Sequence, residues 1–326
     1  MPSDFAPLRR FLEPTTQVAL LTHEKPDGDA VGSCLAMVAL LEKLGKKSIP
    51  CLVGPCPDPY RFLTDKFQCL DILHQPIPAG TDALLVLDTG TWNQLGAGGS
   101  WLKHPGLPRM VLDHHRTQDD LGGPALVDIT AEATAVLVFQ AYAYFGIKPD
   151  PSAANALFTA LAFDTGWFRH SNVTPDTFRM AGELVDLGAQ PTFIYSQVHQ
   201  QEPLRKMQLR GKALSSLKLF HSGKVGLLRL SLDDFQNFGC TLADSEGLSD
   251  LPRHISGVEV AIALFEEAPG KVRVSLRSSG AGDVGKIAES FSGGGHKAAA
   301  GCRLEMNLDL AEKTILQAVQ EHWAKR

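Results

Sequence analysis

Two short apolar runs of this chain end directly in clusters of aspartate and histidine. Residues 18–22 run into the first cluster and residues 110–112 into the second; the clusters are His23, Asp27 and Asp29, and Asp113, His114 and His115. Runs of this length and composition indicate buried strands, which places both clusters where strands end. In an open α/β sheet, ligands bind at the carboxyl ends of the strands. The chain is therefore predicted to fold into a layered α/β domain that carries a divalent-metal site.

Apolar runs alternate with helical patterns through the first 190 residues. The expected strands are 18–22, 48–53, 83–87 and 110–112, and the expected helices are 30–44, 132–146, 153–162 and 177–188. Such alternation is typical of a mostly parallel sheet with helices on both faces. Residues 1–190 are predicted to form this domain.

The pattern changes at Pro191. A polar, basic stretch follows, and residues 191–223 are interpreted as a linker with a connecting helix. Strand patterns return at 224–231, 258–265 and 271–276, and Asp309 with Glu312 has the spacing of a capping box at the start of a terminal helix. Residues 224–326 are therefore predicted to form a second, smaller α+β domain.

The composition excludes several classes of protein. With 44% hydrophobic and 21% charged residues among 326, the chain has enough apolar side chains for two buried cores. A formal net charge of −5 argues against a broad basic surface for long nucleic acid, and no apolar run is long enough to span a bilayer. The six cysteines form no C-x-x-C pair, so neither a disulfide framework nor a zinc knuckle is indicated, and a reducing cytoplasm is the expected location.

Two further aspartates follow apolar segments. Asp88 ends the expected strand 83–87, and Asp164 follows an apolar helix in the sequence D-T-G-W-F-R-H-S-N. Taken alone, each could be an ordinary turn residue, as Asp27 or Asp29 alone could cap a helix. Together with the two clusters they supply the carboxylates and imidazoles that suit Mn²⁺ or Mg²⁺, whereas a thiolate-rich set would indicate zinc. A carboxylate shared by two such ions would let them activate water and stabilise charge on a phosphoryl group.

A glycine-rich run lies in the second domain. Gly293, Gly294 and Gly295 precede His296, and Arg277 lies upstream in S-L-R-S-S-G. Backbone N–H groups of consecutive glycines can form an anion-binding nest, and His296 and Arg277 can donate hydrogen bonds to a phosphate. A flexible loop with a solvated histidine is the alternative. Beside a metal site, the sequence favours phosphate binding.

In the order of these motifs the chain resembles the DHH phosphoesterases with a DHH-associated C-terminal domain. The motifs span nearly the whole chain and are H-E-K-P-D-G-D at 23–29, Asp88, D-H-H at 113–115, Asp164 and G-G-G-H at 293–296. The resemblance implies a metal-dependent phosphoesterase with a catalytic α/β domain and a substrate-binding second domain.

The resemblance also implies a role for each residue. It assigns one ion to His23, Asp27 and Asp88 and a second ion to Asp29, Asp88, His114 and Asp164, so that Asp88 bridges the pair. Mn²⁺ is the expected metal, with Mg²⁺ or Co²⁺ as alternatives. His115 would face the substrate and stabilise or protonate the leaving oxygen, while Asp113 would orient the histidines. The implied substrate contacts are Arg277, Ser278, Gly293, Gly294, Gly295 and His296. Arg116 and Arg169 stand next to metal motifs and are either additional phosphate contacts or structural ion pairs.

Within this family, the compact two-domain form with F-R-x-S-N at 168–172 is similar to the nanoRNase/pAp phosphatase type. That type degrades very short RNAs to mononucleotides and can remove phosphate from 3′-phosphoadenosine 5′-phosphate (pAp). The extra domains of the DNA-exonuclease branch and the membrane segments of the cyclic-dinucleotide branch are not expected here. A manganese pyrophosphatase or short-chain polyphosphatase and a non-catalytic nucleotide sensor remain alternatives. The sequence does not decide whether RNA dinucleotides, linear products of cyclic dinucleotides or pAp are the main substrate. It does not give the oligomeric state either, although a homodimer is the commonest assembly.

Overall fold

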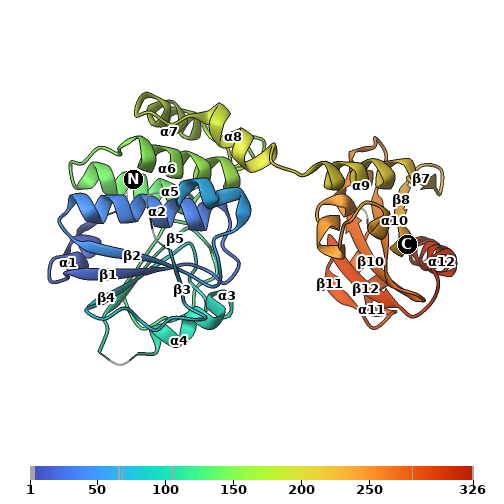
Figure 1. Cartoon of the computed structure of the whole chain (residues 1–326), viewed down its shortest axis with the longest axis horizontal. Helices are drawn as coiled ribbons and strands as arrows, with labels where there is room; N and C mark the ends of the chain where they lie inside the picture. The colour runs from blue at the N-terminus through green and yellow to red at the C-terminus, as the bar shows by residue number, and fades with distance from the viewer. Residues whose placement is uncertain (1–3, 65–66, 68, 105, 281, 325–326) are drawn as a thin grey trace. The chain divides into compact units, whose positions relative to one another are not determined.

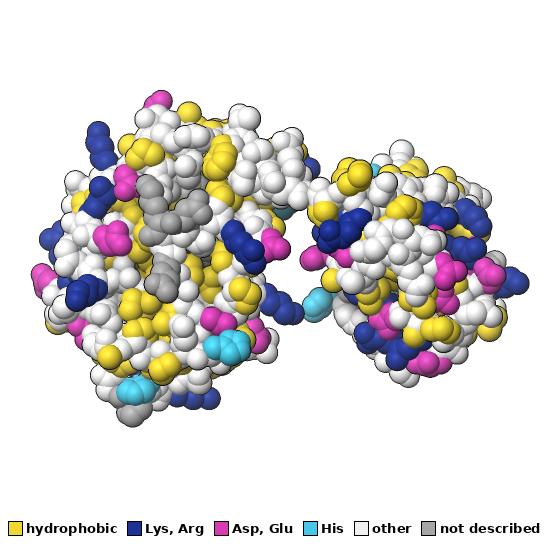
Figure 2. Space-filling model, in the orientation of Figure 1, with side chains coloured by type: hydrophobic (Ala, Val, Ile, Leu, Met, Phe, Trp, Pro, Cys, Tyr) yellow, Lys and Arg dark blue, Asp and Glu magenta, His cyan; other side chains and the backbone are white. Residues whose placement is uncertain are grey.

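The computed structural model describes residues 4–324, except residues 65, 66, 68, 105 and 281. The chain divides into two compact units, residues 1–201 and 202–326 (Figure 1). Each unit has its own six-stranded sheet and its own buried core. On the face shown in Figure 2, basic and acidic side chains are interspersed over both units.

The sheet of the first unit is entirely parallel, with strand order β3-β2-β1-β4-β5-β6. Its strands are β1 (Gln17–Leu21), β2 (Lys47–Leu52), β3 (Leu70–Asp71), β4 (Ala83–Leu87), β5 (Arg109–Asp113) and β6 (Ala125–Val127). The order reverses between β1 and β4, because the chain moves outward in one direction up to β3 and then returns to the other side of β1. Ligands of doubly wound sheets bind at this switch point, outside the carboxyl ends of the strands.

Helices cover both faces of this sheet (Figure 1). Alternate strand residues face opposite sides: Val18 and Leu85 join the core under α2, α5 and α6, whereas Ala19 and Leu84 join a smaller core with Trp101 of α4. The helices are α1 (Ala6–Leu12), α2 (Gly28–Lys43), η1 (Asp58–Leu63), α3 (Trp92–Leu95), η2 (Gly96–Gly98), α4 (Gly99–Leu102), α5 (Thr134–Tyr144), α6 (Pro151–Asp164), α7 (Pro175–Asp186) and α8 (Pro191–His199). The predicted parallel sheet with helices on both faces is confirmed.

The expected strands and helices of the first unit agree with the structure to within two residues at each end. The short elements α1, β3, η1, α3 and β6 were not expected. Residues 96–100 look like a flexible glycine loop in the sequence, but they form η2 and the start of α4; Trp92 packs beside Gly99, so the small residues serve close packing. Among the residues with described positions, every helix is too short or too polar to span a bilayer.

The second unit has a mixed sheet with strand order β11-β12-β10-β9-β8-β7. Only β8 and β9 are parallel, and the other neighbours pair in antiparallel fashion. Its strands are β7 (Lys218–Phe220), β8 (Val225–Leu230), β9 (Val260–Ala268), β10 (Lys271–Ser278), β11 (Gly294–His296) and β12 (Ala299–Leu304). Its helices are α9 (Leu204–Ser215), α10 (Leu232–Asn237), η3 (Leu242–Ser245), η4 (Leu248–His254), α11 (Val284–Glu289) and α12 (Leu308–Ala324).

Helices pack on both sides of the second sheet as well. Ile287 of α11 and Ile315 of α12 pack against one face, and Leu209 of α9 packs against the β8–β9 part of the other face. This arrangement confirms the predicted α+β class. Residues 191–223, expected to link the domains, contain α8 in the first unit and α9 and β7 in the second.

The start of α12 corrects one local prediction. Asp309 and Glu312 do not form a capping box, because both carboxylates bind the guanidinium of Arg229. The Asn307 side chain instead accepts the N–H of Leu310, as a helix cap does. The capping-box spacing was present in the sequence, but a cationic partner on β8 competes for its carboxylates.

Candidate metal centre

Six side chains from five elements converge at the switch point of the first sheet. They follow the carboxyl ends of β1, β4 and β5 or lie at the start of α2 and the end of α6, and they are His23, Asp27, Asp29, Asp88, His114 and Asp164. Together with His115 they form three groups of three residues, and within each group the ligand atoms lie within 4.8 Å of one another. The structure therefore gathers all six residues that the sequence predicts as metal ligands.

His23, Asp27 and Asp88 form one group. The His23 Nε2 atom lies 3.7 Å from Asp27 Oδ2 and 3.5 Å from Asp88 Oδ2. The other oxygen of Asp27 accepts the N–H groups of Asp29 and Ala30 and so caps α2. Asp27 thus caps the helix with one oxygen and faces the site with the other. The helix-capping role and the position of a metal ligand, both considered for it from the sequence, are therefore compatible.

His114 lies among the remaining carboxylates. Its Nε2 atom is 3.1 Å from Asp164 Oδ2, 3.6 Å from Asp88 Oδ1 and 3.9 Å from Asp29 Oδ2. Its Nδ1 atom is 3.2 Å from the carbonyl of Ala131, which fixes the ring and leaves Nε2 as the ligand atom. Asp88 has one oxygen near His23 and the other near His114, so it connects the two groups.

Asp113 positions His115 rather than joining the carboxylate cluster. One buried oxygen of Asp113 accepts the backbone N–H groups of both following histidines and lies 2.8 Å from His115 Nδ1. The other oxygen accepts a hydrogen bond from Gln118 Nε2 at 2.6 Å. His115 is half-buried, and its described side-chain contacts are made through Nδ1.

The charges in the site are unbalanced. Burial, together with the neighbouring charges of Asp88 and Asp164, raises the pKa of Asp29 well above its ordinary value. Burial alone would lower the pKa of His23, but the carboxylates of Asp27 and Asp88 raise it to about 9. Among the described residues, only histidines pair with these aspartates, and no lysine or arginine does.

This donor set fits divalent cations. The buried His114 Nε2 atom makes no well-directed hydrogen bond within the described part of the chain, although it lies 3.1 Å from Asp164 Oδ2, and a buried polar atom without a hydrogen bond is costly unless an ion or water satisfies it. Bound cations would satisfy that atom and offset the repulsion among the aspartates. Imidazole and carboxylate together suit Mn²⁺ and similar ions.

The backbone around the site is adapted to bring these groups together. Asp88 has a φ of 61°, a left-handed conformation that is uncommon outside glycine and that often marks functional sites. A Cβ atom at Gly28 would lie 2.7 Å from Phe163 Cβ. Only glycine lets the first turn of α2 approach the end of α6 this closely, and that approach places Asp29 near Asp164.

Four residues that hold the site were not predicted from the sequence. The Thr134 and Ala135 N–H groups at the start of α5 donate to Asp29, as does the Ser33 hydroxyl, and the Thr134 hydroxyl donates to Asp88. Ser33 lies four residues after Asp29 on one helix face, which the sequence could have indicated. Thr134 and Gln118 carry no such signal, because their contacts depend on the tertiary fold.

The predicted arginine contacts in the first unit lie at its surface. Arg116 and Arg169 are exposed, and Arg169 Nε donates to the carbonyl of Gly166 at 2.7 Å. Asp164, by contrast, has its backbone carbonyl held by Asn172 Nδ2 at 3.2 Å. The end of α6 is therefore held by hydrogen bonds from side chains of the residues that follow it.

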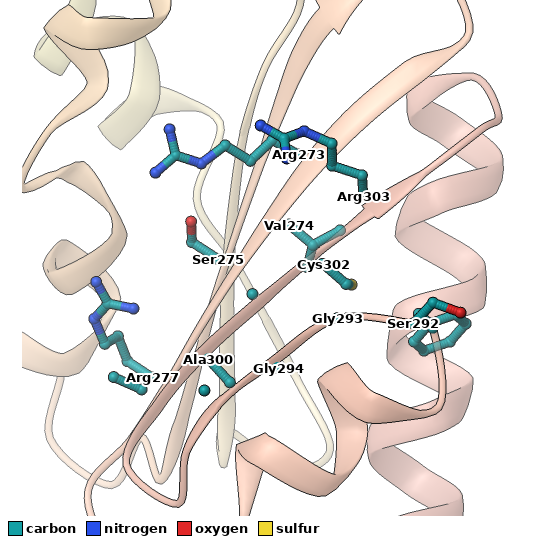
Figure 3. A pocket seen from close by; sticks show the side chains of 14 residues that line it. Arg273, Val274, Ser275, Arg277, Ser292, Gly293, Gly294, Ala300, Cys302 and Arg303 are labelled. Atoms are coloured by element: carbon teal, nitrogen blue, oxygen red, sulfur yellow. The ribbon is translucent and has the colours of Figure 1, made fainter.

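The predicted substrate residues of the second unit surround the β10–β12 sheet edge. Arg277 lines a cleft of about 630 Å³ together with Gly293, Gly294 and Gly295 (Figure 3). Ser278 instead faces the core side of β10, where it is buried and its hydroxyl accepts the N–H of Gly282. His296 is exposed at the end of β11.

The glycine run is part of a strand rather than a free loop. Gly294 and His296 pair with β12, and a Cβ atom at Gly293 would lie 2.3 Å from the carbonyl oxygen of Gly301. Gly295 has a φ of 140°, and a Cβ atom there would lie 2.6 Å from Ala300 Cα. At Gly293 and Gly295, close strand packing by itself requires glycine.

Family models match both units of the chain. The N-terminal domain of the DHH family matches residues 17–162, and the DHHA1 domain matches residues 227–322. The bifunctional oligoribonuclease and PAP phosphatase NrnA of Thermus thermophilus is 30% identical over 309 residues, which cover 93% of this chain and 89% of the relative. The chain belongs to the DHH family. This DHH protein is thus a metal-dependent phosphoesterase, as its motifs predict.

Two further comparisons agree with this assignment. The NrnA protein of Bacillus subtilis is 27% identical over 292 residues, with 88% of this chain and 89% of that protein covered. A crystal structure of an exopolyphosphatase-related protein from Bacteroides fragilis superposes with a TM-score of 0.80 at 23% identity, covering 96% of this DHH protein and 94% of the other chain. At that identity the likeness supports the fold alone.

Proposed function

We propose that this DHH phosphoesterase hydrolyses very short RNAs, down to dinucleotides, to mononucleotides, and removes a phosphate from pAp to give AMP. The observation that carries the proposal is the convergence of four aspartates and two histidines at the switch point of the sheet. Two relatives covered over 89% of their length are named oligoribonuclease and PAP phosphatase. Those names direct the proposal toward this substrate class.

The proposed metal ligands follow the two groups of the site. His23, Asp27 and Asp88 would hold one ion, and Asp29, Asp88, His114 and Asp164 would hold a second, with Asp88 shared. The distances of 3.5 Å from Asp88 to His23 and 3.6 Å from Asp88 to His114 support a shared carboxylate. We propose Mn²⁺ as the metal, because the site combines hard carboxylates with borderline imidazoles.

When bound, the ions would lower the pKa of a water molecule and stabilise negative charge on the phosphoryl group. His115 would then donate a hydrogen bond or a proton to the leaving oxygen through Nε2. Asp113 supports that role, since its contact with Nδ1 fixes the ring orientation and raises the pKa of His115. Gln118 donates to the second Asp113 oxygen and thereby helps to hold both Asp113 and His115 in place.

The second unit would bind the rest of the nucleotide. Arg277, with its guanidinium partly exposed on the cleft face of β10, is the proposed phosphate ligand, and His296 with the backbone of Gly294 would assist it. Arg116 and Arg169 are exposed beside the metal motifs and are proposed as additional phosphate contacts. Ser278 would act indirectly, by fixing the turn through Gly282.

A panel of substrates tests the proposal. Purified protein would be incubated with Mn²⁺, or with chelator, and an RNA dinucleotide, a long RNA, pAp or pyrophosphate. Chelator-sensitive release of mononucleotides from the dinucleotide, with slower attack on the long RNA, is the expected result. Preference for pyrophosphate would replace the proposal with a pyrophosphatase, and turnover of none of the four would exclude hydrolysis of these substrates.

A further inference from the structure

One face of the second sheet is left open where β10 pairs with β12. Residues alternate between the two faces of a strand, and Val272, Val274 and Leu276 of β10 pack into the core against α11 and α12. The intervening residues of β10 therefore face away from that core. Arg273, Ser275 and Arg277 line the cleft together with Ala299, Gly301 and Arg303 of β12.

The arginines of this cleft differ in how far their charge is neutralised. Arg303 makes two contacts with Glu267, at 2.9 and 3.3 Å, and Arg277 Nε lies 3.6 Å from Asp250. Arg273 is exposed and, within the described part of the chain, has neither an ion pair nor a side-chain hydrogen bond. Arg273 thus carries a positive charge without an ion-pair partner among the described residues, and Arg303 lies directly across from it in the strand register.

The floor between the arginines is built from small residues. Ala299 and Gly301 occupy the facing positions of β12, and Gly294 has open space where a Cβ atom would lie. Ser275 adds a hydroxyl between the two β10 arginines. A polymer backbone can therefore approach the sheet closely along a line that starts at Arg277 and ends at Arg273.

Arg273 and Arg277 cannot share one phosphate group in their present positions. Four residues along a strand correspond to about 13 Å, and Figure 3 shows the two guanidinium groups at separate ends of the cleft, with Ser275 between them. A dinucleotide has a single internucleotide phosphate. An anion that engages both arginines therefore has at least two phosphates, spaced along an extended chain.

We propose that Arg273, with Arg303 beside it, is a distal phosphate subsite that selects RNAs longer than dinucleotides. This inference rests on the proposed function, because it takes Arg277 as the phosphate ligand of the bound RNA. A dinucleotide occupies the Arg277 end alone, whereas a longer RNA such as a pentanucleotide also reaches Arg273. The chain then prefers oligonucleotides of a few residues to dinucleotides in binding, although both enter the same cleft.

Binding measured without turnover tests the subsite separately from the activity. Fluorescence anisotropy of a labelled pentanucleotide and a labelled dinucleotide would be recorded with full-length protein in chelator, for the native chain and Arg273→Ala. The substitution should lower the ratio of pentanucleotide to dinucleotide affinity by at least about 10-fold, as expected for one charge-assisted contact. The slope of log affinity against log salt concentration should fall by about 0.7 for the pentanucleotide, the value for one neutralised phosphate of a single strand.

Matched variants make the result specific. Lys313→Ala removes one positive charge from the exposed side of α12, away from the cleft, and should leave the ratio unchanged. Arg273→Lys should retain most of the salt slope, since it keeps the charge. An unchanged ratio of pentanucleotide to dinucleotide affinity in Arg273→Ala would overturn the subsite, and so would an equal fall of that ratio in Lys313→Ala. If tripolyphosphate competed as strongly as the pentanucleotide, the assignment of the subsite to RNA would be overturned. Length-dependent binding without any hydrolysis of RNA in Mn²⁺ would keep the subsite and reject the proposed function.

Discussion

Asp88 combines burial, negative charge and a left-handed backbone in one residue. Its side chain lies within reach of His23 and His114, and burial raises the pKa of its carboxyl group above the ordinary value. Replacement by asparagine keeps the volume and the tolerance for a positive φ but removes the charge. We expect Asp88→Asn to reduce metal-dependent hydrolysis by more than about 100-fold, because both groups lose a ligand, and metal titration by calorimetry should show weakened binding at the whole site.

The matched control is Asp58→Asn, because the Asp58 side chain is 82% exposed and lies outside the site. This variant should retain its activity and its metal affinity. If Asp88→Asn kept one ion at native affinity and near-native turnover, the carboxylate would not be shared between two ions.

Gln118 acts through Asp113 and His115. Its Nε2 atom donates to Asp113 at 2.6 Å and to the His115 carbonyl at 3.0 Å, so its loss would loosen the orientation of the His115 ring. We expect Gln118→Ala to lower kcat about 10-fold with little change in KM. Gln118→Glu should lower kcat further, since it places a second carboxylate beside Asp113. Gln236→Ala, on the exposed side of α10, is the control and should leave kcat unchanged. A purely structural role for Gln118 would instead lower the melting temperature and leave the kcat of the folded enzyme intact.

At the scale of elements, the site depends on the close packing of α2 against α6. A Cβ atom at Gly32 would lie 2.3 Å from the backbone oxygen of Ala156, so Gly32→Ala must push the two helices apart. We expect the free energy of unfolding of the first unit to fall by about 1–3 kcal/mol. Gly182→Ala in α7 is the matched control, because no atom lies within 4 Å of its added methyl group, and it should stabilise by about 0.4–1 kcal/mol. Urea denaturation of both variants measures the difference, and equal effects would show that the packing at Gly32 is looser than described.

The elements that the sequence predicts well are those whose residues repeat a simple pattern. The strands β1 and β4 and the helix α6 are nearly continuous apolar segments that end in aspartate or histidine, so both their type and their chemistry are visible. The short edge strands β3 and β11 are not, because Gly294–His296 has no apolar alternation and becomes a strand only through pairing with β12. The same limit applies to Thr134 and Arg273, since their surroundings are assembled from distant segments. Metal ligands are thus easier to predict than the groups that hold them.

At the scale of the whole molecule, the metal site links segments that are far apart in the sequence. Its ligands extend from His23 to Asp164, so the site exists only when the first unit is folded, and any ion bound there stabilises that unit by mass action. At about 100 times the dissociation constant, the gain is about 2.7 kcal/mol. Because the two units have separate cores, we expect calorimetry to resolve two unfolding transitions. Mn²⁺ should raise the midpoint temperature of one of them, and chelator should lower it again. Gly32→Ala identifies that transition as the first unit's by lowering it, and Asp88→Asn should abolish the Mn²⁺ shift. A shift confined to the other transition, or one retained in Asp88→Asn, would place the dominant metal site outside the carboxylate cluster.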